Sequence, residues 1–99
     1  MTIEEVRLED KLQLNLGGRI DANQAPELQN AVLKAFQKSS KVILNFSEIS
    51  YISSAGLRAL LIGQKTAASK GGSFTLININ ESVAEILRVT GLSKALTIQ

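Results

Sequence analysis

The sequence contains neither cysteine nor histidine. These absences exclude thiol nucleophiles, thiolate and imidazole metal ligands, and the general base that works most often at neutral pH. Asp21, Glu27 and Glu48 are the acidic residues that come closest to candidate acids or bases, but no spacing forces any two of them together, and carboxylates are ordinarily solvated at the surface. We therefore expect no catalytic site, no metal site and no cofactor.

Aromatic residues, long apolar runs and concentrated charge are scarce as well. Only 4% of the residues are aromatic, and the 11 basic and 9 acidic residues are interspersed along the chain and give a net charge of +2. Few rings are available to stack on bases, and no basic patch is concentrated enough to indicate a nucleic-acid partner. No apolar run approaches the ~20 residues of a membrane span, and "MTIEEVRLED" is acidic where a secretory signal would be basic. A cytoplasmic protein without a membrane span is the expectation.

The residues that are present suit one small aliphatic core. The chain has 99 residues, of which 44% are hydrophobic, and a domain of this length buries somewhat over ~60% of the surface of its unfolded chain. No Pro- or Ser-rich linker, low-complexity segment or repeat divides it. We expect a single domain over residues 1–99, with a core of Leu, Ile, Val and Ala.

Hydrophobic periodicity predicts the first three elements. Residues 3–20 alternate between apolar and polar side chains around the charged turn "EDK", which indicates a β-hairpin. Residues 21–40 follow a helical pattern, with Pro26 in the first turn and Asn23 or a neighbour as the cap. The apolar face of this helix comprises Leu28, Ala31, Val32, Ala35 and Phe36.

The second half alternates strands and helices. "KVILNF", residues 41–46, is an almost continuous apolar run that favours a central parallel strand buried on both faces. A helix from about residue 54 to 69 should end at Gly71 and Gly72, followed by a strand in "SFTLINI". Asn80 should cap the helix "ESVAEILRVT", with Gly91 at its end and an edge strand in "KALTI". The order ββαβαβαβ predicts the α/β class, as a mixed β-sheet with helices packed on it.

The stretch "YISSAGLRALL", residues 51–61, lies where a strand's carboxyl end meets a helix's amino end, which is a common place for function. One serine, Ser53 or Ser54, is expected to cap the helix, and one hydroxyl suffices. The other permits two interpretations. The helix amino end could bind an anion, although no Gly-rich phosphate loop with "GK[ST]" supports a nucleotide. Alternatively, Ser54 accepts a phosphoryl group, and the small neighbours Ser53, Ala55 and Gly56 let another protein's active site approach.

The helix after this junction has two predicted faces. At ~100° per residue, one face turns toward the sheet with Leu57, Leu60, Leu61, Gln64 and Ala68. The other carries Ser54, Arg58, Ile62, Lys65 and Ser69. Single exposed apolar residues are common, but Ile62, flanked by Arg58 and two turns from Ser54, is a candidate anchor for a partner protein.

Three segments together carry a resemblance to a known family: "GRIDANQAPELQNAV", "VILNFSEISYISSAGLRALL" and "VAEILRVTGLSKAL". In order and spacing the chain resembles STAS domains, and within them bacterial anti-sigma factor antagonists. The resemblance implies a switch in which the unphosphorylated form binds a serine kinase that is also an anti-sigma factor, which frees the sigma factor. Phosphorylation by that kinase would end the binding, and a serine phosphatase is a further partner that such a switch can use.

The resemblance also assigns residues. The family pattern is D-S-[STA]-G-L, so Ser54 takes the place of the acceptor, with Ala55 and Gly56 after it. Ser53 stands where relatives carry aspartate and brings no negative charge, and Asn45 stands where many relatives carry an acid. Asp21, in "GRID", matches an acidic position near the partner-binding edge. The candidate partner-binding residues are Asp21, Asn23, Arg58, Ile62 and Lys65.

Two other functions remain open from the sequence. One keeps the STAS scaffold as an interaction subunit of another signalling or transport complex, without phosphorylation of Ser54. The other is a small module that binds a nucleotide or another anion at the same junction.

Overall fold

The computed structural model describes all 99 residues, and its elements follow the predicted order ββαβαβαβ. The strands are β1 Thr2–Leu8, β2 Lys11–Ile20, β3 Lys41–Ile52, β4 Ser73–Ile77 and β5 Thr97–Ile98. The helices are α1 Ala25–Lys38, α2 Ser54–Lys70 and α3 Glu81–Val89, and a short 3₁₀ turn, η1 Leu92–Lys94, leads into β5. The predicted class and order are therefore confirmed.

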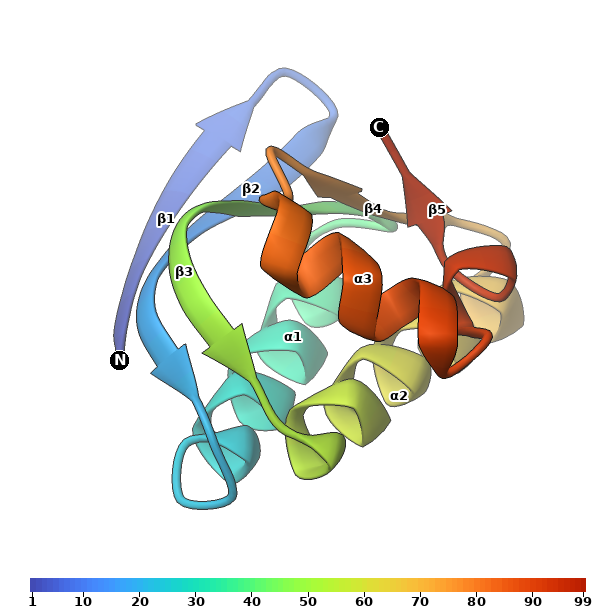
Figure 1. Ribbon diagram of the computed structural model, residues 1–99. Coiled ribbons are helices and arrows are strands. Elements are labelled where there is room, and N and C mark those ends of the chain that lie inside the picture. Colours follow the sequence, from blue (N-terminus) through green and yellow to red (C-terminus); the bar gives the residue numbers. More distant parts are fainter.

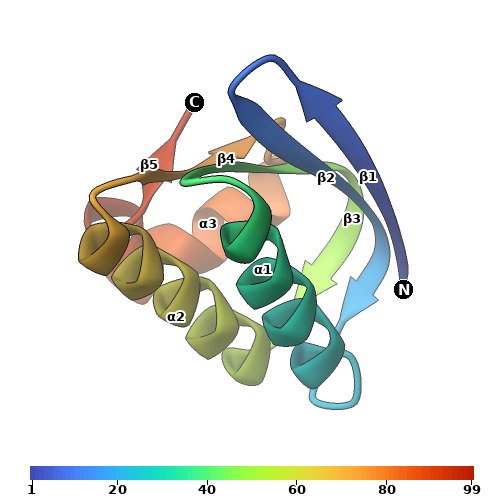
Figure 2. The same ribbon diagram turned by 180° about the vertical axis from the view of Figure 1, so that it is seen from behind.

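The five strands form one sheet in the order β1-β2-β3-β4-β5. The β1–β2 hairpin is antiparallel, and the other three pairings are parallel. Figures 1 and 2 show that all three helices lie on the same side of this sheet. Because β2 and β3 are parallel, their carboxyl ends meet at one end of the sheet, and α1 and α2 both start there.

Burial divides the sheet into a covered and an open face. On β3, Val42, Leu44 and Phe46 are fully buried beneath the helices, whereas Ile43 and Asn45 between them are only half-buried. The prediction that "KVILNF" is buried on both faces is wrong, because all three helices pack on one side. Two register shifts against β2 each add a residue to β3, and they keep the later buried side chains of β3 on the covered face.

Helix α2 packs through small residues that its hydrophobic pattern did not single out. Leu57 and Leu60 are buried as predicted, but Gln64 is half-buried and Ala68 is exposed. The closest contacts are instead made by Gly63, where an added Cβ would lie 2.6 Å from the Phe74 ring. The buried stripe of α2 comprises Gly56, Leu57, Ala59, Leu60, Gly63 and Ala67. The missing side chains let the helix lie close to the sheet.

Helix ends confirm most of the predicted caps. Asn80 accepts a hydrogen bond from the Val83 N–H at 2.9 Å, and Gly71 and Gly91 adopt the left-handed conformation at their helix ends. For helix α1 the prediction was Asn23 or a neighbour. The N-cap position is the neighbour Gln24, which makes no side-chain capping hydrogen bond.

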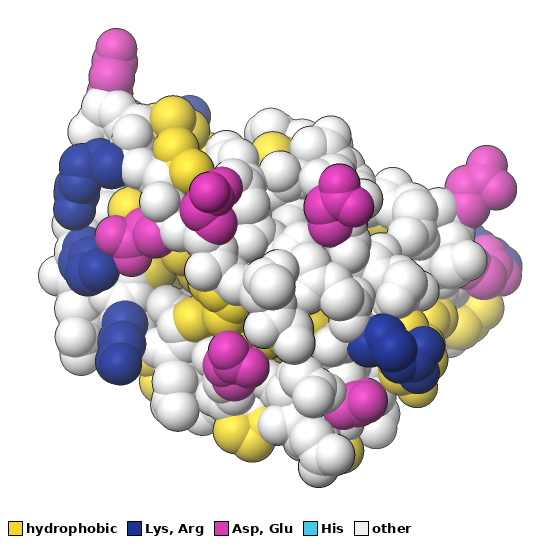
Figure 3. All heavy atoms as spheres, turned by 90° about the vertical axis from the view of Figure 1, so that its left-hand side faces the viewer, with side chains coloured by type: hydrophobic (Ala, Val, Ile, Leu, Met, Phe, Trp, Pro, Cys, Tyr) yellow, Lys and Arg dark blue, Asp and Glu magenta, His cyan; other side chains and the backbone are white.

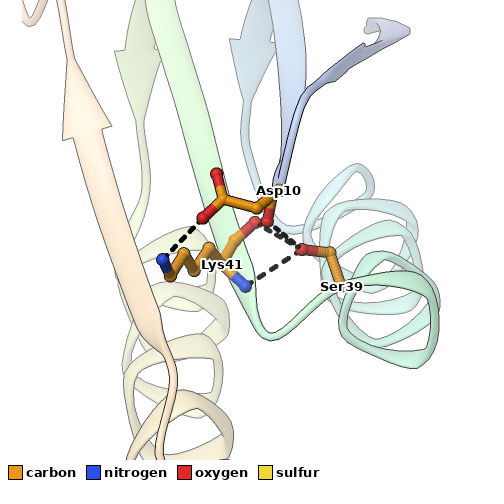
Figure 4. Close-up of polar contacts among 3 residues, drawn as sticks. All are labelled: Asp10, Ser39 and Lys41. Atoms are coloured by element: carbon orange, nitrogen blue, oxygen red, sulfur yellow. Dashed lines mark hydrogen bonds and ion pairs between the residues drawn. The ribbon is translucent and has the colours of Figure 1, made fainter.

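At the amino ends of the parallel strands, a polar cluster joins the hairpin turn to the start of β3 (Figure 4). Lys41 Nζ lies 2.7 Å from Asp10 Oδ2. The Ser39 hydroxyl accepts from the Lys41 N–H at 3.1 Å and lies within hydrogen-bonding distance of two carbonyl oxygens, that of Asp10 at 3.1 Å and that of Lys41 at 3.0 Å. The pairing with Lys41 lowers the pKa of the Asp10 carboxyl below its ordinary value. At this end of the sheet, polar groups are therefore bonded to one another within the chain.

Candidate functional site at the amino end of helix α2

The two serines of the junction have different surroundings. Ser53 is the N-cap of α2: its backbone is extended, its hydroxyl accepts a hydrogen bond from the Gly56 N–H at 3.2 Å, and its own N–H donates to the Ile20 carbonyl at 2.8 Å. Capping bonds of this kind contribute about 1 kcal/mol to helix stability. The hydroxyl of Ser53 is therefore already in use, and its side chain is half-buried.

Ser54 is the first residue of the helix, and its side chain is exposed. No side-chain hydrogen bond of the chain involves its hydroxyl, in contrast to Ser53. The side chain thus projects into solvent at the positive end of the helix dipole. Of the two serines, Ser54 is the one that another molecule can reach.

Gly56 has a packing role rather than an exposed one. It is buried, and a Cβ at this position would lie 2.7 Å from Ile52 Cγ1 and 2.8 Å from Ile20 Cγ2. The interpretation that Gly56 opens the junction to an approaching active site is therefore wrong. The glycine lets the first turn of α2 sit directly on the ends of β2 and β3.

Asp21 and Asn23 form the loop between β2 and α1, beside the start of α2. Asp21 is half-buried; its Oδ1 accepts from the Asn23 N–H at 3.1 Å, and its carbonyl accepts from the N–H groups of Gln24 and Ala25. Asn23 itself is exposed. Asp21 therefore holds the turn that leads into helix α1, and it leaves its second carboxylate oxygen and the Asn23 side-chain amide free.

Helices α1 and α2 enclose an open groove of about 320 Å³ next to the Ser53–Ser54 junction. Ile62, which the sequence placed on an exposed face, is half-buried and lines this groove, and Arg58 lies beside it. Lys65 is exposed and is not part of the lining. The eight lining residues are Ala22, Ala25, Pro26, Gln29, Asn30, Ala55, Arg58 and Ile62.

The basic side chains of helix α2 near the groove form no ion pairs. The three ion pairs of the chain are Lys38–Glu5, Lys41–Asp10 and Arg88–Glu85, so Arg58 and Lys65 belong to none. The face of the molecule seen in Figure 3 carries basic and acidic side chains side by side, with apolar ones between them. On that face no broad field of one sign develops, as the interspersed sequence predicted.

A row of amide side chains on the open sheet face escaped the sequence analysis. Asn15 donates to Glu4 at 3.0 Å, and its Oδ1 accepts from Gln13 at 2.8 Å and Asn45 at 2.9 Å. Asn45 Oδ1 in turn accepts from Asn78 at 3.0 Å. Polar residues at alternate positions of β2, and Asn45 within the apolar run of β3, were the signals for this row. Its members use one another as partners, and none lines the groove.

The structure has neither a cluster of potential metal ligands nor a helix that could span a membrane. No three acidic side chains gather where they could hold a metal ion. No helix combines the length and the hydropathy that crossing a bilayer requires.

Comparisons with known proteins agree with the fold. The family model described as the STAS domain matches residues 2–99. The anti-sigma-B factor antagonist of Bacillus subtilis (strain 168) is 28% identical over 90 residues, which cover 91% of this chain and 83% of that protein. Its name describes a regulatory protein rather than an enzyme.

Solved structures share the architecture. An anti-sigma factor antagonist from Mycobacterium paratuberculosis superposes with a TM-score of 0.87 at 19% identity, covering 98% of this chain and 83% of that one. The Bacillus cell fate determinant SpoIIAA in its phosphorylated form superposes with a TM-score of 0.75 at 16% identity, covering 99% and 91%. At these identities the likeness establishes the fold alone.

Proposed function

Since the chain belongs to the STAS domain family, we propose that it is an anti-sigma factor antagonist controlled by phosphorylation of Ser54. In its unphosphorylated form it binds an anti-sigma factor that is also a serine protein kinase, and a sigma factor is released. Phosphorylation ends the binding, and a serine phosphatase restores it. The names of the relatives support the antagonist role.

The observation that supports this proposal most directly is that only one of the two serine hydroxyls is hydrogen-bonded within the chain. The Ser53 hydroxyl caps α2, and the Ser54 hydroxyl is exposed and unbonded. In the transfer, the Ser54 oxygen attacks the γ-phosphorus of ATP held by the kinase, and the bond from that phosphorus to ADP breaks. The hydroxyl proton passes to a base of the kinase. The helix tolerates the product, because an anion in the first turn is favoured by about 0.3–1 kcal/mol.

Release of the partner follows from charge. A phosphoserine adds about −1.5 to −2 charges at pH 7. Burial of that charge in an interface built for a neutral serine is expected to cost about 2–5 kcal/mol, which weakens binding by about 30-fold to several thousand-fold. The helix-dipole gain is smaller, so the phosphorylated form should dissociate.

The partner surface that we propose surrounds Ser54. Asp21 and Asn23 offer free polar atoms from the loop before α1, and Ile62 offers an apolar contact in the groove. Arg58 and Lys65 extend along the exposed side of α2 without internal ion pairs. These residues therefore combine one small apolar anchor with unpaired polar groups, as protein interfaces commonly do.

The first test is incubation with a serine kinase of the anti-sigma type and ATP, followed by mass-spectrometric mapping of the modified residue. We expect one phosphate, on Ser54. Ser54→Ala should abolish the modification, and Ser53→Ala should retain it. Phosphate on Ser53, or none on either serine, would contradict the proposal.

The second test measures binding to the same kinase in a pull-down. Ser54→Ala should bind like the parent chain, and Ser54→Asp should bind much more weakly. If Ser54→Asp is retained as well as the parent chain, the switch is wrong, and a constitutive interaction subunit becomes the better description. Calorimetric titration with nucleotides should give no heat; saturable heat would favour the ligand-binding alternative.

A further inference from the structure

At the amino end of helix α2, the positive end of the helix dipole and the Arg58 side chain face no negative side chain of the same helix. Its 17 residues include Arg58, Lys65 and Lys70 and no acidic residue. Because the amino end of a helix is itself positive, a cation near it is unfavourable and an anion is favourable. A negative group at the start of α2 would compensate both the dipole and Arg58.

Arg58 is placed to meet such a group. It is exposed, and the three ion pairs of the chain involve other residues. It follows Ser54 by four residues, the spacing at which helical side chains are neighbours on one face. The Ser54 side chain on that face is also exposed, and its hydroxyl has no partner.

We propose that Arg58 is the internal counter-charge of the Ser54 phosphate: after phosphorylation its guanidinium binds the phosphate oxygens within the same helix. This inference rests on the proposed function, since it requires a phosphate at Ser54, and it adds a positioning residue to it. A planar guanidinium is well matched to this task, because two of its N–H groups can donate to two phosphate oxygens at once.

The pairing changes the groove as well as the junction. Arg58 is the only charged residue among the eight that line the groove between α1 and α2. Once it binds the phosphate, its charge is neutralised there. Phosphorylation then acts twice, by adding negative charge at Ser54 and by removing from the groove the cation that an acidic side chain of the partner would contact.

The test uses phosphoserine inserted at position 54 during translation, so no kinase is needed. The second ionisation of the phosphate is followed by phosphorus NMR against pH. We expect Arg58→Gln to raise the measured phosphate pKa by about half a unit, the size of an exposed ion pair. Arg58→Lys should give an intermediate value. Lys65→Gln removes the same charge two turns further along α2 and should leave the titration unchanged.

A titration of Arg58→Gln that matches the parent phosphoprotein would overturn this inference, as would an equal shift in Lys65→Gln, which would indicate net charge alone. Both results are independent of the kinase experiments. If a kinase does not modify Ser54, the proposed function fails while the titration still decides whether Arg58 binds a phosphate there.

Discussion

The two ends of the parallel strands use their polar groups in opposite ways. At the amino ends, Asp10, Ser39 and Lys41 bond to one another and to the backbone (Figure 4). At the carboxyl ends, Ser54 and Arg58 are exposed and have no partner in the chain. The same sheet thus has a closed end, where Asp10, Ser39 and Lys41 hold the fold together, and an open end, where Ser54 and Arg58 remain available to another molecule although the Ser53 hydroxyl is bonded.

Both ends nevertheless depend on a glycine against which other atoms pack closely. At the closed end an added Cβ on Gly72 would lie 1.8 Å from the Ser40 carbonyl oxygen, and at the open end one on Gly56 would lie 2.7 Å from an Ile52 carbon. The contact at Gly72 is much shorter and is made with a backbone carbonyl, which cannot move without the chain around it, whereas the contacts at Gly56 are made with side-chain carbons. An added methyl group should therefore destabilise the protein more at Gly72 than at Gly56.

The largest expected effect is that of Gly72→Ala. The clash with the Ser40 carbonyl also disturbs the Ser73 N–H bond that this oxygen accepts at 2.9 Å. We expect a loss of about 3 kcal/mol or more in the free energy of unfolding, measured by urea denaturation. Gly71→Ala is the matched control: nothing lies within 4 Å of its added Cβ, so only left-handed backbone strain of about 1–2 kcal/mol applies. Equal losses in both variants would refute the clash.

Gly56→Ala should have a smaller effect at the open end. The buried Ile20 and Ile52 side chains must shift to admit the new methyl group, so overpacking of about 1–3 kcal/mol is expected. Urea denaturation of Gly56→Ala and Gly72→Ala in parallel shows which variant loses more of the free energy of unfolding. A larger loss for Gly56→Ala would mean that the open end is the more rigid of the two.

Within the open end, Ser53→Ala and Ser54→Ala should have different effects on stability. Removal of the Ser53 hydroxyl leaves the Gly56 N–H without its partner, and a loss of about 1 kcal/mol in unfolding free energy is expected. Ser54→Ala removes a hydroxyl that has no side-chain hydrogen bond, so its unfolding free energy should lie within about 0.5 kcal/mol of the parent value. The reverse ranking would show that Ser54 is the cap and would remove the basis for choosing it as acceptor.

The elements that sequence could predict are those set by local chemistry. The Asn80 cap, a cap at one of the two serines Ser53 and Ser54, and the glycines Gly71 and Gly91 at helix ends follow from residues a few positions away, and all are confirmed. Burial on both faces of "KVILNF" was predicted wrongly, since it depends on which side the three helices pack. Local sequence carries little information about that choice.

The candidate site, like the fold, could be predicted from the sequence only in part. The sequence located the junction and named Ser54 as the acceptor, but it left the helix cap open between Ser53 and Ser54. The hydrogen bond from the Gly56 N–H shows that the Ser53 hydroxyl is the one in use. The groove was missed because Ile62 faces it only when α1 lies alongside α2. The packing stripe was misplaced because Gly63 and Ala67 have little or no side chain to contribute to a hydrophobic pattern.

The smallest expected effect concerns the closed end and depends on pH. Lys41 lowers the pKa of the Asp10 carboxyl below its ordinary value of 3.8, mainly through their hydrogen bond and then through their charges. The ionised form is therefore favoured by folding, and its contribution is present above pH 3.8 and lost as the pH falls through the lower folded-state pKa. Because the carboxylate is exposed, solvent and salt screen the pair, and the effect should be small.

Asp10→Asn isolates this contribution. At neutral pH and low salt the parent chain should have the higher urea midpoint, and the difference should vanish in acid, where Asp10 is protonated in both folded and unfolded chains. Glu9→Gln is the matched control, because it removes a carboxylate from the same turn that belongs to no ion pair. If Glu9→Gln gives the same pH-dependent difference, the net charge of the turn accounts for the effect. A difference confined to Asp10→Asn would instead assign it to the contact with Lys41, and so to the bonded cluster that distinguishes the closed end from the open one.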